Sequence, residues 1–283
     1  VLCRTTRVPS RPMPVPCLPA ASRGTRASRP GRDPRAAAMS SPTTSLLKVT
    51  EILAAAVVLA GGSGTRVGAD RNKVLLPVAG RPVLARSLAT FVRMPEIGPI
   101  VLVTRPQERA ATRAMVEADP DLAGAAELLV VDGGASRQES ELSGLRALSG
   151  RVAAGLVDAV LVHDGARPLA TPALAREVLA VARAYGGAVP GVPVSDLAVA
   201  RKVTESDEMP FPVGERLTAA APGLVAVQTP QGFRAGPLLA ACEAAAREGF
   251  VGTDTASCVE RYAGLTVRWV VATGRNLKIT YAH

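Results

Sequence analysis

The chain has 283 residues, of which 48% are hydrophobic and 3% aromatic, which is ample for the core of one large domain or two small ones. Its formal net charge is +9, but residues 1–38 contain eight arginines and one acidic residue and carry +7 of that charge. The rest of the chain is nearly neutral and poor in aromatic residues, which argues against nucleic acid as a partner. The sequence has no uninterrupted run of about 18 apolar residues, so we expect no membrane-spanning helix and no membrane partner.

Residues 1–45 are predicted to form a disordered tail. The segment is rich in Arg, Pro and Ser and lacks apolar periodicity, so it cannot bury enough surface to offset the entropy of ordering. Arg-rich, acid-poor leaders occur as organellar transit peptides, which would predict a plastid protein. Met39 opens a more ordinary N-terminus and would place residues 1–38 outside the native protein. We prefer this second interpretation and expect a cytoplasmic protein, with residues 46–283 as its folded domain.

The next segment pairs an apolar strand with a glycine loop. Residues 57–60 are apolar without alternation, as in a strand covered on both faces of a parallel sheet. The glycines that follow allow backbone N–H groups to approach an anion closely, and Arg66 and Lys73 add positive charge. Lys73 lacks the Gly-Lys-Ser/Thr context of a Walker loop, and Val67 stands where the dinucleotide pattern needs glycine. We therefore predict a loop that binds a nucleoside triphosphate; the alternative is a turn that only joins two elements.

Past this loop, short strand-like runs alternate with helical patterns. The expected strands are 100–104, 127–131, 159–163, 188–192 and 266–271. The expected helices are 83–92, 107–117, 138–148 and 173–184, with helix starts near Pro106, Ser136 and Thr171. The alternation predicts an α/β fold with an open, mostly parallel sheet, and such sheets bind ligands at the carboxyl ends of their strands.

Polar residues follow two of the expected strands at the point where each ends. A glycine turn at 132–135 leads into a helix start, and Asp164 and Arg167 follow the strand that ends at His163. The chain has two histidines and no CxxC pair, so a metal is expected to be held by carboxylate and phosphate oxygens, which Mg²⁺ prefers. Asp164 is the natural ligand, and Arg167 would orient it or hold a second phosphate. An ordinary salt bridge between these two side chains is the alternative.

The motifs, taken in order, resemble the 2-C-methyl-D-erythritol 4-phosphate cytidylyltransferase family over about residues 54–280. Those that carry the resemblance are Ala60-Gly61-Gly62-Ser63-Gly64-Thr65-Arg66 with Lys73, Asp132-Gly133-Gly134 with Arg137 and Ser140, His163-Asp164-Gly165-Ala166-Arg167-Pro168, Gln228-Thr229-Pro230-Gln231-Gly232-Phe233, Thr253-Asp254-Thr255-Ala256-Ser257 and Asn276-Leu277-Lys278. The resemblance implies a Mg²⁺-dependent nucleotidyltransferase that transfers CMP from CTP to 2-C-methyl-D-erythritol 4-phosphate. Pyrophosphate would be released, in non-mevalonate isoprenoid biosynthesis.

The resemblance also implies a role for residues of each motif. The residues implied to be catalytic, through stabilisation of the charged transition state or alignment of the acceptor phosphate, are Arg66, Lys73 and Lys278. Those implied to bind the nucleotide are Ala60, Gly61, Gly62, Ser63, Gly64, Thr65, Gly134, Ala135, Arg137, Ser140 and Gly165. Those implied to bind substrate are Asp164, Arg167, Thr229 and Arg216, with Asp164 also the ligand of Mg²⁺.

The implied architecture is a Rossmann-like sheet with helices on both faces and a protruding β-arm that clasps a second subunit in a homodimer. The arm would span about residues 194–228, where Pro and Gly suit an extended course better than a helix. A disordered linker is the alternative for this segment.

The sequence departs from the family pattern mainly in the arm. Leu197 and Ala221 stand where the family has the threonine and arginine of the acceptor site, so Arg216 would have to supply the missing cation. Asn72 also replaces the proline that usually precedes the catalytic lysine. Two other interpretations therefore stay open: a cytidylyltransferase for another polyol phosphate such as ribitol 5-phosphate, and a paralogue that binds nucleotide without turnover.

Overall fold

A computed structural model describes residues 52–62, 72–123, 125, 127–194, 197–200, 213–217 and 224–280, with only the backbone for 197–200 and 213–217. The predicted tail at 1–45 and residues 63–66 of the predicted phosphate loop lie outside the described residues. The predictions made for them stay predictions.

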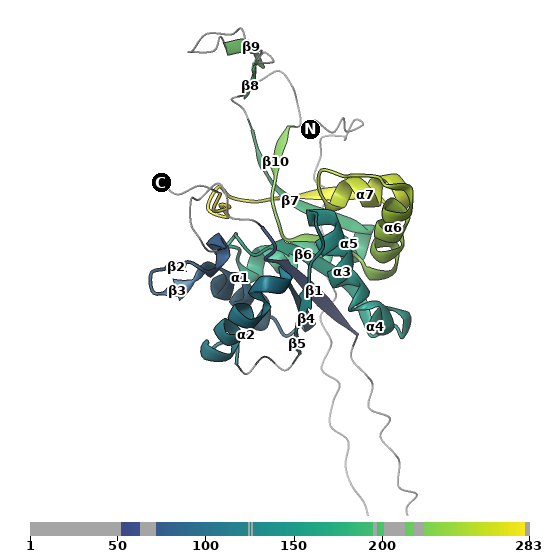
Figure 1. The fold of residues 1–283 in the computed structure, drawn as a ribbon. Coiled ribbons are helices and arrows are strands. Elements are labelled where there is room, and N and C mark those ends of the chain that lie inside the picture. The colour runs from purple at the N-terminus through teal and green to yellow at the C-terminus, as the bar shows by residue number, and fades with distance from the viewer. Residues whose placement is uncertain are drawn as a thin grey trace, which may run out of the picture. The chain divides into compact units, whose positions relative to one another are not determined.

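The described strands form one eight-stranded sheet and two separate strand pairs, β2–β3 and β8–β9 (Figure 1). The order along the large sheet is β10–β7–β11–β6–β1–β4–β5, and β12 pairs with β7. Strand β1 is parallel to β4 and β6, β4 to β5, and β7 to β12, whereas β10 and β11 are antiparallel to their neighbours. The strand bounds are β1 (Leu53–Leu59), β2 (Pro77–Val78), β3 (Arg81–Pro82), β4 (Ile97–Thr104), β5 (Leu128–Asp132), β6 (Val157–Asp164), β7 (Gly187–Pro193), β8 (Leu197–Ala200), β9 (Val213–Leu217), β10 (Val225–Val227), β11 (Gln231–Arg234) and β12 (Val267–Val271). The predicted mostly parallel sheet is confirmed.

Four of the helices begin and end within two residues of the ranges predicted for them. Their bounds are α1 (Val83–Val92), α2 (Arg109–Ala118), α3 (Arg137–Arg146), α4 (Ser149–Ala153), α5 (Pro172–Tyr185), α6 (Ala235–Glu248) and α7 (Thr255–Tyr262), with 3₁₀ turns η2 (Lys73–Leu75) and η3 (Pro106–Glu108). The helix expected at 107–117 begins as η3 and becomes α-helical at Arg109. Within the described part of the chain, none of the helices has the length and apolar character that a membrane span requires.

Two of the predicted helix starts are N-caps. The Ser136 hydroxyl accepts a hydrogen bond from the N–H of Glu139, and the Thr171 hydroxyl accepts one from the N–H of Leu174. Each cap satisfies a donor that the first turn of a helix leaves unpaired. These local signals explain why α3 and α5 begin where the sequence predicts.

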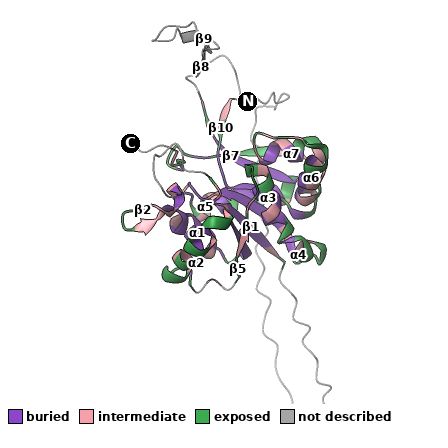
Figure 2. Cartoon of the chain, viewed as in Figure 1, coloured by how far each residue is buried: buried purple, intermediate pink, exposed green. Residues whose placement is uncertain are grey.

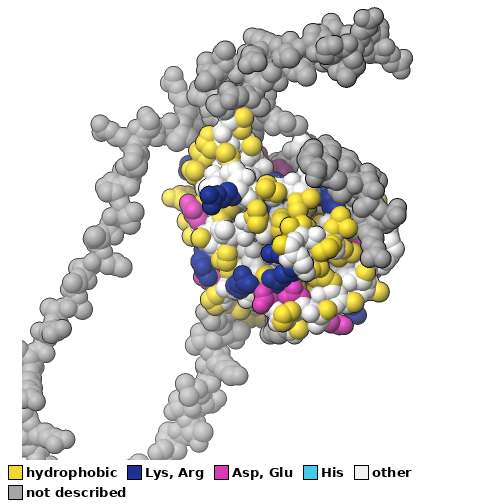
Figure 3. Space-filling view, turned by 90° about the vertical axis from the view of Figure 1, so that its left-hand side faces the viewer, with side chains coloured by type: hydrophobic (Ala, Val, Ile, Leu, Met, Phe, Trp, Pro, Cys, Tyr) yellow, Lys and Arg dark blue, Asp and Glu magenta, His cyan; other side chains and the backbone are white. Residues whose placement is uncertain are grey.

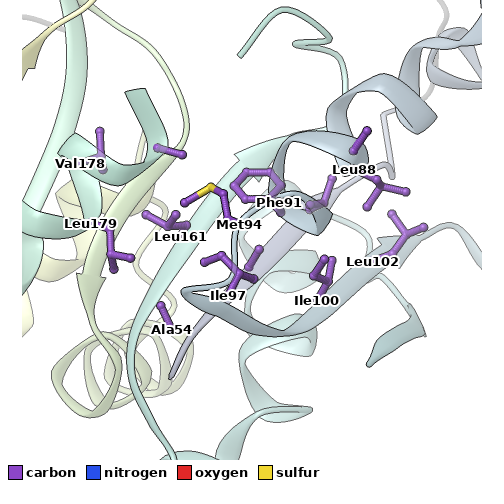
Figure 4. Close-up of a cluster of buried hydrophobic side chains, with 14 of the residues drawn as sticks. Ala54, Leu88, Phe91, Met94, Ile97, Ile100, Leu102, Leu161, Val178 and Leu179 are labelled. Carbon is purple, nitrogen blue, oxygen red and sulfur yellow. The ribbon is translucent and has the colours of Figure 1, made fainter. Parts of the chain in front are cut away.

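Two buried clusters cover the two faces of the sheet, whose strands are mostly buried (Figure 2). Ala54, Ala56 and Val58 of β1 belong to the cluster with α1 and α5, while Ala55 and Val57 belong to the cluster with α3, α6 and α7. This alternation within a continuous apolar run places β1 between two layers of helices. Figure 4 shows the first cluster, in which Phe91 of α1 lies among side chains from the neighbouring strands. The predicted helices on both faces are confirmed.

Strand β11 was not predicted, because four residues with one glycine carry no usable period. It lies antiparallel between β6 and β7. A Cβ at Gly232 would lie 2.9 Å from Cγ1 of Val178 in α5, so glycine allows this helix to pack directly against the strand. Pairing with two strands and packing against α5 therefore make this segment a strand.

The described part of the predicted arm is extended, as expected. Strands β8 and β9 pair with each other in antiparallel fashion, with Leu197 opposite Leu217 and Ala198 opposite Arg216. Strand β10 pairs with β7. Ala221 lies outside the described residues, as do the side chains of Leu197 and Arg216.

Candidate active site

Asp164 is the centre of a charged cluster at the carboxyl edge of the sheet. It ends β6 opposite Leu59, the last residue of β1, so the two strands deliver their following loops to the same edge. Its Oδ2 lies 2.9 Å from Nζ of Lys278, and Arg137 and Arg167 each approach one carboxylate oxygen to 3.6 Å. Three cations from three separate segments therefore surround one carboxylate.

The cluster keeps Asp164 ionised. Burial opposes its negative charge, but the positive charges of Lys278 and Arg137 outweigh that effect and lower the pKa of this carboxyl to about 2. The Nε atom of Arg167 is buried and has no hydrogen-bond partner among the described residues. Lys278 and Arg137 are both partly exposed. Positive charge therefore exceeds what Asp164 neutralises, as a polyphosphate site requires.

The loop after β6 is tied to the end of β1. The N–H of Gly165 donates to the carbonyl oxygen of Leu59 over 2.9 Å. A Cβ at position 165 would lie 3.0 Å from that oxygen and 2.9 Å from Cδ1 of Leu84. Only glycine fits here without displacement of neighbouring atoms, so Gly165 sets how closely the Asp164 loop approaches the glycine segment after β1.

His163 and Thr229 hold the backbone on each side of Asp164. The Thr229 hydroxyl accepts a hydrogen bond from the N–H of Asp164 at 3.0 Å and lies 3.1 Å from Nδ1 of His163. The carbonyl of Arg167, 3.3 Å from Nε2 of His163, can only accept, so Nε2 carries the proton of the neutral ring and Nδ1 accepts from the Thr229 hydroxyl. Burial lowers the pKa of His163 to about 4, so the ring is neutral, as this arrangement needs.

A second set of hydrogen bonds places Lys278. The side-chain amide of Asn276 donates to Oε1 of Gln228 and to the carbonyl of Thr229, each over 2.9 Å. Nη1 of Arg167 in turn donates to the carbonyl of Asn276 at 2.7 Å. The C-terminal segment is thereby joined to the Asp164 loop, and this brings the ammonium group of Lys278 to the carboxylate.

The second predicted glycine turn feeds α3 as expected. The Ser140 hydroxyl accepts from the N–H of Gly134 at 3.1 Å and donates to the carbonyl of Ser136 at 2.9 Å, while the N–H of Ala135 donates to Glu139. The turn is therefore fixed by the first residues of its own helix. This arrangement directs Arg137, at the start of α3, toward Asp164.

Glu141 was missed by the sequence analysis although it follows Arg137 at helical spacing. It is 2% exposed, and its Oε2 accepts a hydrogen bond from Nη1 of Arg137 at 2.9 Å. Burial raises the pKa of Glu141 to about 7, and the charge of Arg137 opposes this rise. Arg137 thus bridges two carboxylates, those of Glu141 and Asp164.

Glu141→Gln is expected to remove part of the pH dependence of stability. The pKa of Glu141 lies above its ordinary 4.5 in the fold, so its contribution to stability is present in acid and is lost as the pH rises through about 7. Between pH 5 and pH 8 the free energy of unfolding should fall by roughly 2 kcal/mol more in the wild type than in Glu141→Gln, as measured by urea unfolding. Glu243→Gln is the control, because its ion pair with Arg146 lowers the pKa of Glu243 and moves its titration out of this range. Parallel pH profiles for the wild type and Glu141→Gln would contradict this.

The first predicted loop is described only at its two ends. Ala60 is buried at the end of β1, and Gly61 and Gly62 follow it. Lys73 begins η2. Ser63, Gly64, Thr65 and Arg66 lie outside the described residues.

The predicted site residues thus fall into three groups. The structure brings together Asp164, Arg167, Arg137, Lys278 and Thr229, directly or through His163. It places Ala60, Gly61, Gly62, Gly134, Ala135 and Gly165 on the loops at the same edge, with Ser140 near the start of α3. Lys73 lies in η2, and the structure does not describe Ser63, Gly64, Thr65, Arg66 or the side chain of Arg216.

A mostly parallel α/β sheet that gathers glycine turns and three cations around one ionised carboxylate is typical of proteins that bind nucleotide phosphates. The sequence profile of the 2-C-methyl-D-erythritol 4-phosphate cytidylyltransferase family matches residues 54–283. The chain is 40% identical to the protein of that name from Geobacter metallireducens over 225 residues. This match covers 80% of the chain and 91% of the relative. It is 43% identical over 232 residues to that of Cereibacter sphaeroides strain KD131, with coverage of 80% and 91%.

A solved structure agrees with these relatives. The 2-C-methyl-D-erythritol 4-phosphate cytidylyltransferase of Thermus thermophilus superposes with a TM-score of 0.58 at 30% identity, covering 79% of this chain and 91% of that one. The chain belongs to the 2-C-methyl-D-erythritol 4-phosphate cytidylyltransferase family.

Proposed function

We propose that the protein transfers CMP from CTP to 2-C-methyl-D-erythritol 4-phosphate and releases pyrophosphate, as a step of non-mevalonate isoprenoid biosynthesis. Family membership supports this proposal. The observation that carries it is the cluster of Lys278, Arg137 and Arg167 around Asp164, at the sheet edge where the glycine turns lie. Such a cluster suits a reaction in which negative charge accumulates on phosphate groups.

The chemistry needs positioning and charge neutralisation from the protein. A phosphate oxygen of the acceptor attacks the α-phosphorus of CTP; a new P–O bond forms, and the bond to the β-phosphate oxygen breaks. Arg66 and Lys73 would stabilise the α-phosphate as charge builds on it, and Lys278 would align the acceptor phosphate against it. Backbone N–H groups of the glycine segment after Ala60 would cradle the triphosphate. Ser140 and the Gly134 turn would bind the base and ribose.

Mg²⁺ is part of this proposal, with Asp164 as its protein ligand. A carboxylate with a pKa of about 2 is a permanent hard oxygen donor, and Mg²⁺ is often held by one or two carboxylates together with substrate phosphates. When bound, the ion would neutralise charge on the triphosphate. Within the described part of the chain no group of three or more potential side-chain ligands occurs, which fits an ion shared with the substrate.

We further propose a cytoplasmic homodimer in which the arm brings Arg216 to the acceptor. Val227, Gly191 and Val271 lie in one row across β10, β7 and β12, and the two valines are 45% and 65% exposed. Trp269, two residues before Val271 on the same face of β12, is 48% exposed. Adjacent exposed apolar side chains of this kind favour burial against a second subunit. On the face shown in Figure 3, Lys and Arg side chains lie in separate groups, one of them beside acidic side chains.

An acceptor panel tests the function. Pyrophosphate release is measured with CTP and Mg²⁺ in the presence of 2-C-methyl-D-erythritol 4-phosphate, ribitol 5-phosphate or no acceptor. Release that depends on 2-C-methyl-D-erythritol 4-phosphate is expected. Release only with ribitol 5-phosphate would replace the proposed acceptor, and CTP binding without release would indicate a non-catalytic paralogue.

A further inference from the structure

Asn72, the residue before Lys73, is a buried side chain with three hydrogen bonds. It is 1% exposed, and its Nδ2 donates to the carbonyl of Ala60 at 2.6 Å and to Oε2 of Glu108 at 2.8 Å. Its Oδ1 accepts from the N–H of Val74 at 3.3 Å. These partners belong to the end of β1, to η3 and to η2. One amide therefore joins the turn that carries Lys73 to two other parts of the fold.

Glu108 determines which way this amide faces. The carbonyl of Ala60 and the carboxylate of Glu108 can only accept, so both protons of Nδ2 are used and Oδ1 is left for Val74. Glu108 is 9% exposed and forms an ion pair with Arg105. The carboxylate of Glu108 therefore has a cation on one side and the amide of Asn72 on the other. Both protons and the oxygen of that amide are hydrogen-bonded, as a buried polar side chain requires.

The bond to Ala60 connects Lys73 with the edge that carries Asp164. The N–H of Ala60 donates to the carbonyl of Val103 at 2.7 Å, so the residue is fixed to the sheet, and the preceding Leu59 pairs with Asp164. Within η2, the N–H of Leu75 donates to the carbonyl of Asn72 at 2.9 Å. Asn72 is therefore the covalent neighbour of Lys73 and also its hydrogen-bonded link to the sheet.

We propose that Asn72 is a positioning residue for Lys73 and that Glu108, through the side-chain amide of Asn72, fixes the η2 turn against the end of β1. The catalytic consequence rests on the function proposed above for Lys73. A preorganised cation stabilises charge in the transition state only when its backbone is held in place, so loss of this link should lower turnover more than substrate binding.

Four variants test the proposal in the pyrophosphate assay: Asn72→Ala, Asn72→Asp, Glu108→Gln and the double variant Asn72→Asp/Glu108→Gln. Asn72→Ala is expected to lower kcat at least ~10-fold while KM for the acceptor changes less than ~3-fold. The kcat of Asn72→Asp should be lower than that of Asn72→Ala, because the substitution places a second carboxylate 2.8 Å from that of Glu108. In the double variant the new amide at position 108 can donate to the new carboxylate, which relieves this repulsion, but the carboxylate cannot donate to the carbonyl of Ala60, so kcat should stay at least ~10-fold below the wild type.

Thr112→Val is the matched control for a general loss of stability. Thr112 is buried on α2, and its hydroxyl is bonded to that of Thr104 and to no part of the Asn72 network. This variant also removes one buried hydrogen bond, and we expect kcat within ~3-fold of the wild type. If Asn72→Ala behaves like Thr112→Val, or if the double variant regains the kcat of the wild type without a donor to Ala60, the proposal is wrong.

Native-state hydrogen exchange separates this proposal from the proposed function. The N–H groups of Val74 and Leu75 bond to Asn72, so their protection should fall in Asn72→Ala but not in Thr112→Val. Unchanged protection would overturn the positioning role even in an active enzyme. A wild type without pyrophosphate release would overturn the function, and the exchange measurement would still decide whether Asn72 holds the turn.

Discussion

Asp164→Asn should lower the rate of CMP transfer roughly 100- to 1000-fold, the scale on which enzymes lose a preorganised charge contact. The amide keeps the shape of the side chain but removes the charge that Lys278, Arg137 and Arg167 surround. It also removes the proposed ligand of Mg²⁺, so the concentration of Mg²⁺ needed for half-maximal rate should rise. Steady-state pyrophosphate release over a Mg²⁺ titration measures both effects.

Asp158→Asn is the matched control for this variant. Asp158 lies near the start of the same strand and forms an ion pair with Arg183 at 2.8 Å. A surface pair of this kind contributes little to stability and is remote from the carboxyl edge. The control should keep its rate and its Mg²⁺ requirement. Comparable rates for the two variants would remove Asp164 from the mechanism.

Lys73→Ala and Arg66→Ala should each lower turnover at least ~100-fold, because both remove positive charge from the α-phosphate in the transition state. The loss should appear mainly in kcat, since the cradle of backbone N–H groups continues to bind the triphosphate. Single-turnover measurements with saturating CTP give the chemical step directly. Arg93→Ala is the control, because Arg93 is an exposed cation paired with Asp121. Normal turnover in either the Lys73 or the Arg66 variant would refute the assigned role.

The parts of the fold that the sequence predicts are those with local causes. Helix α1 spans Val83–Val92 as expected, and Ser136 and Thr171 cap their helices, since apolar spacing and capping act within a few residues. The strand β11 has no such signal, because its place is set by packing against α5 and by pairing with two strands far away in the chain. Long-range pairing and packing, which local sequence patterns do not show, determine that β11 is a strand.

The same distinction applies to the site. Asp164 and Arg167 were predictable because they follow an apolar strand, and Lys278 was found only through the family resemblance. The hydrogen bonds that hold the site were not predictable: Asn276, close to Lys278, is bonded to a residue 48 positions away, and Asn72, next to Lys73, is bonded to Glu108 across 36 positions. Hydrogen bonds over such separations exist only after folding. For Asn72 the sole sequence signal was its departure from the family pattern.

The most direct test of the account is a crystal structure of the protein with CTP and Mg²⁺. We expect the side chains of Arg66 and Lys73 on the α-phosphate, with Asp164 on the metal ion and Lys278 facing the acceptor phosphate. A triphosphate bound with Arg66, Lys73 and Asp164 directed to different places would contradict the proposed mechanism.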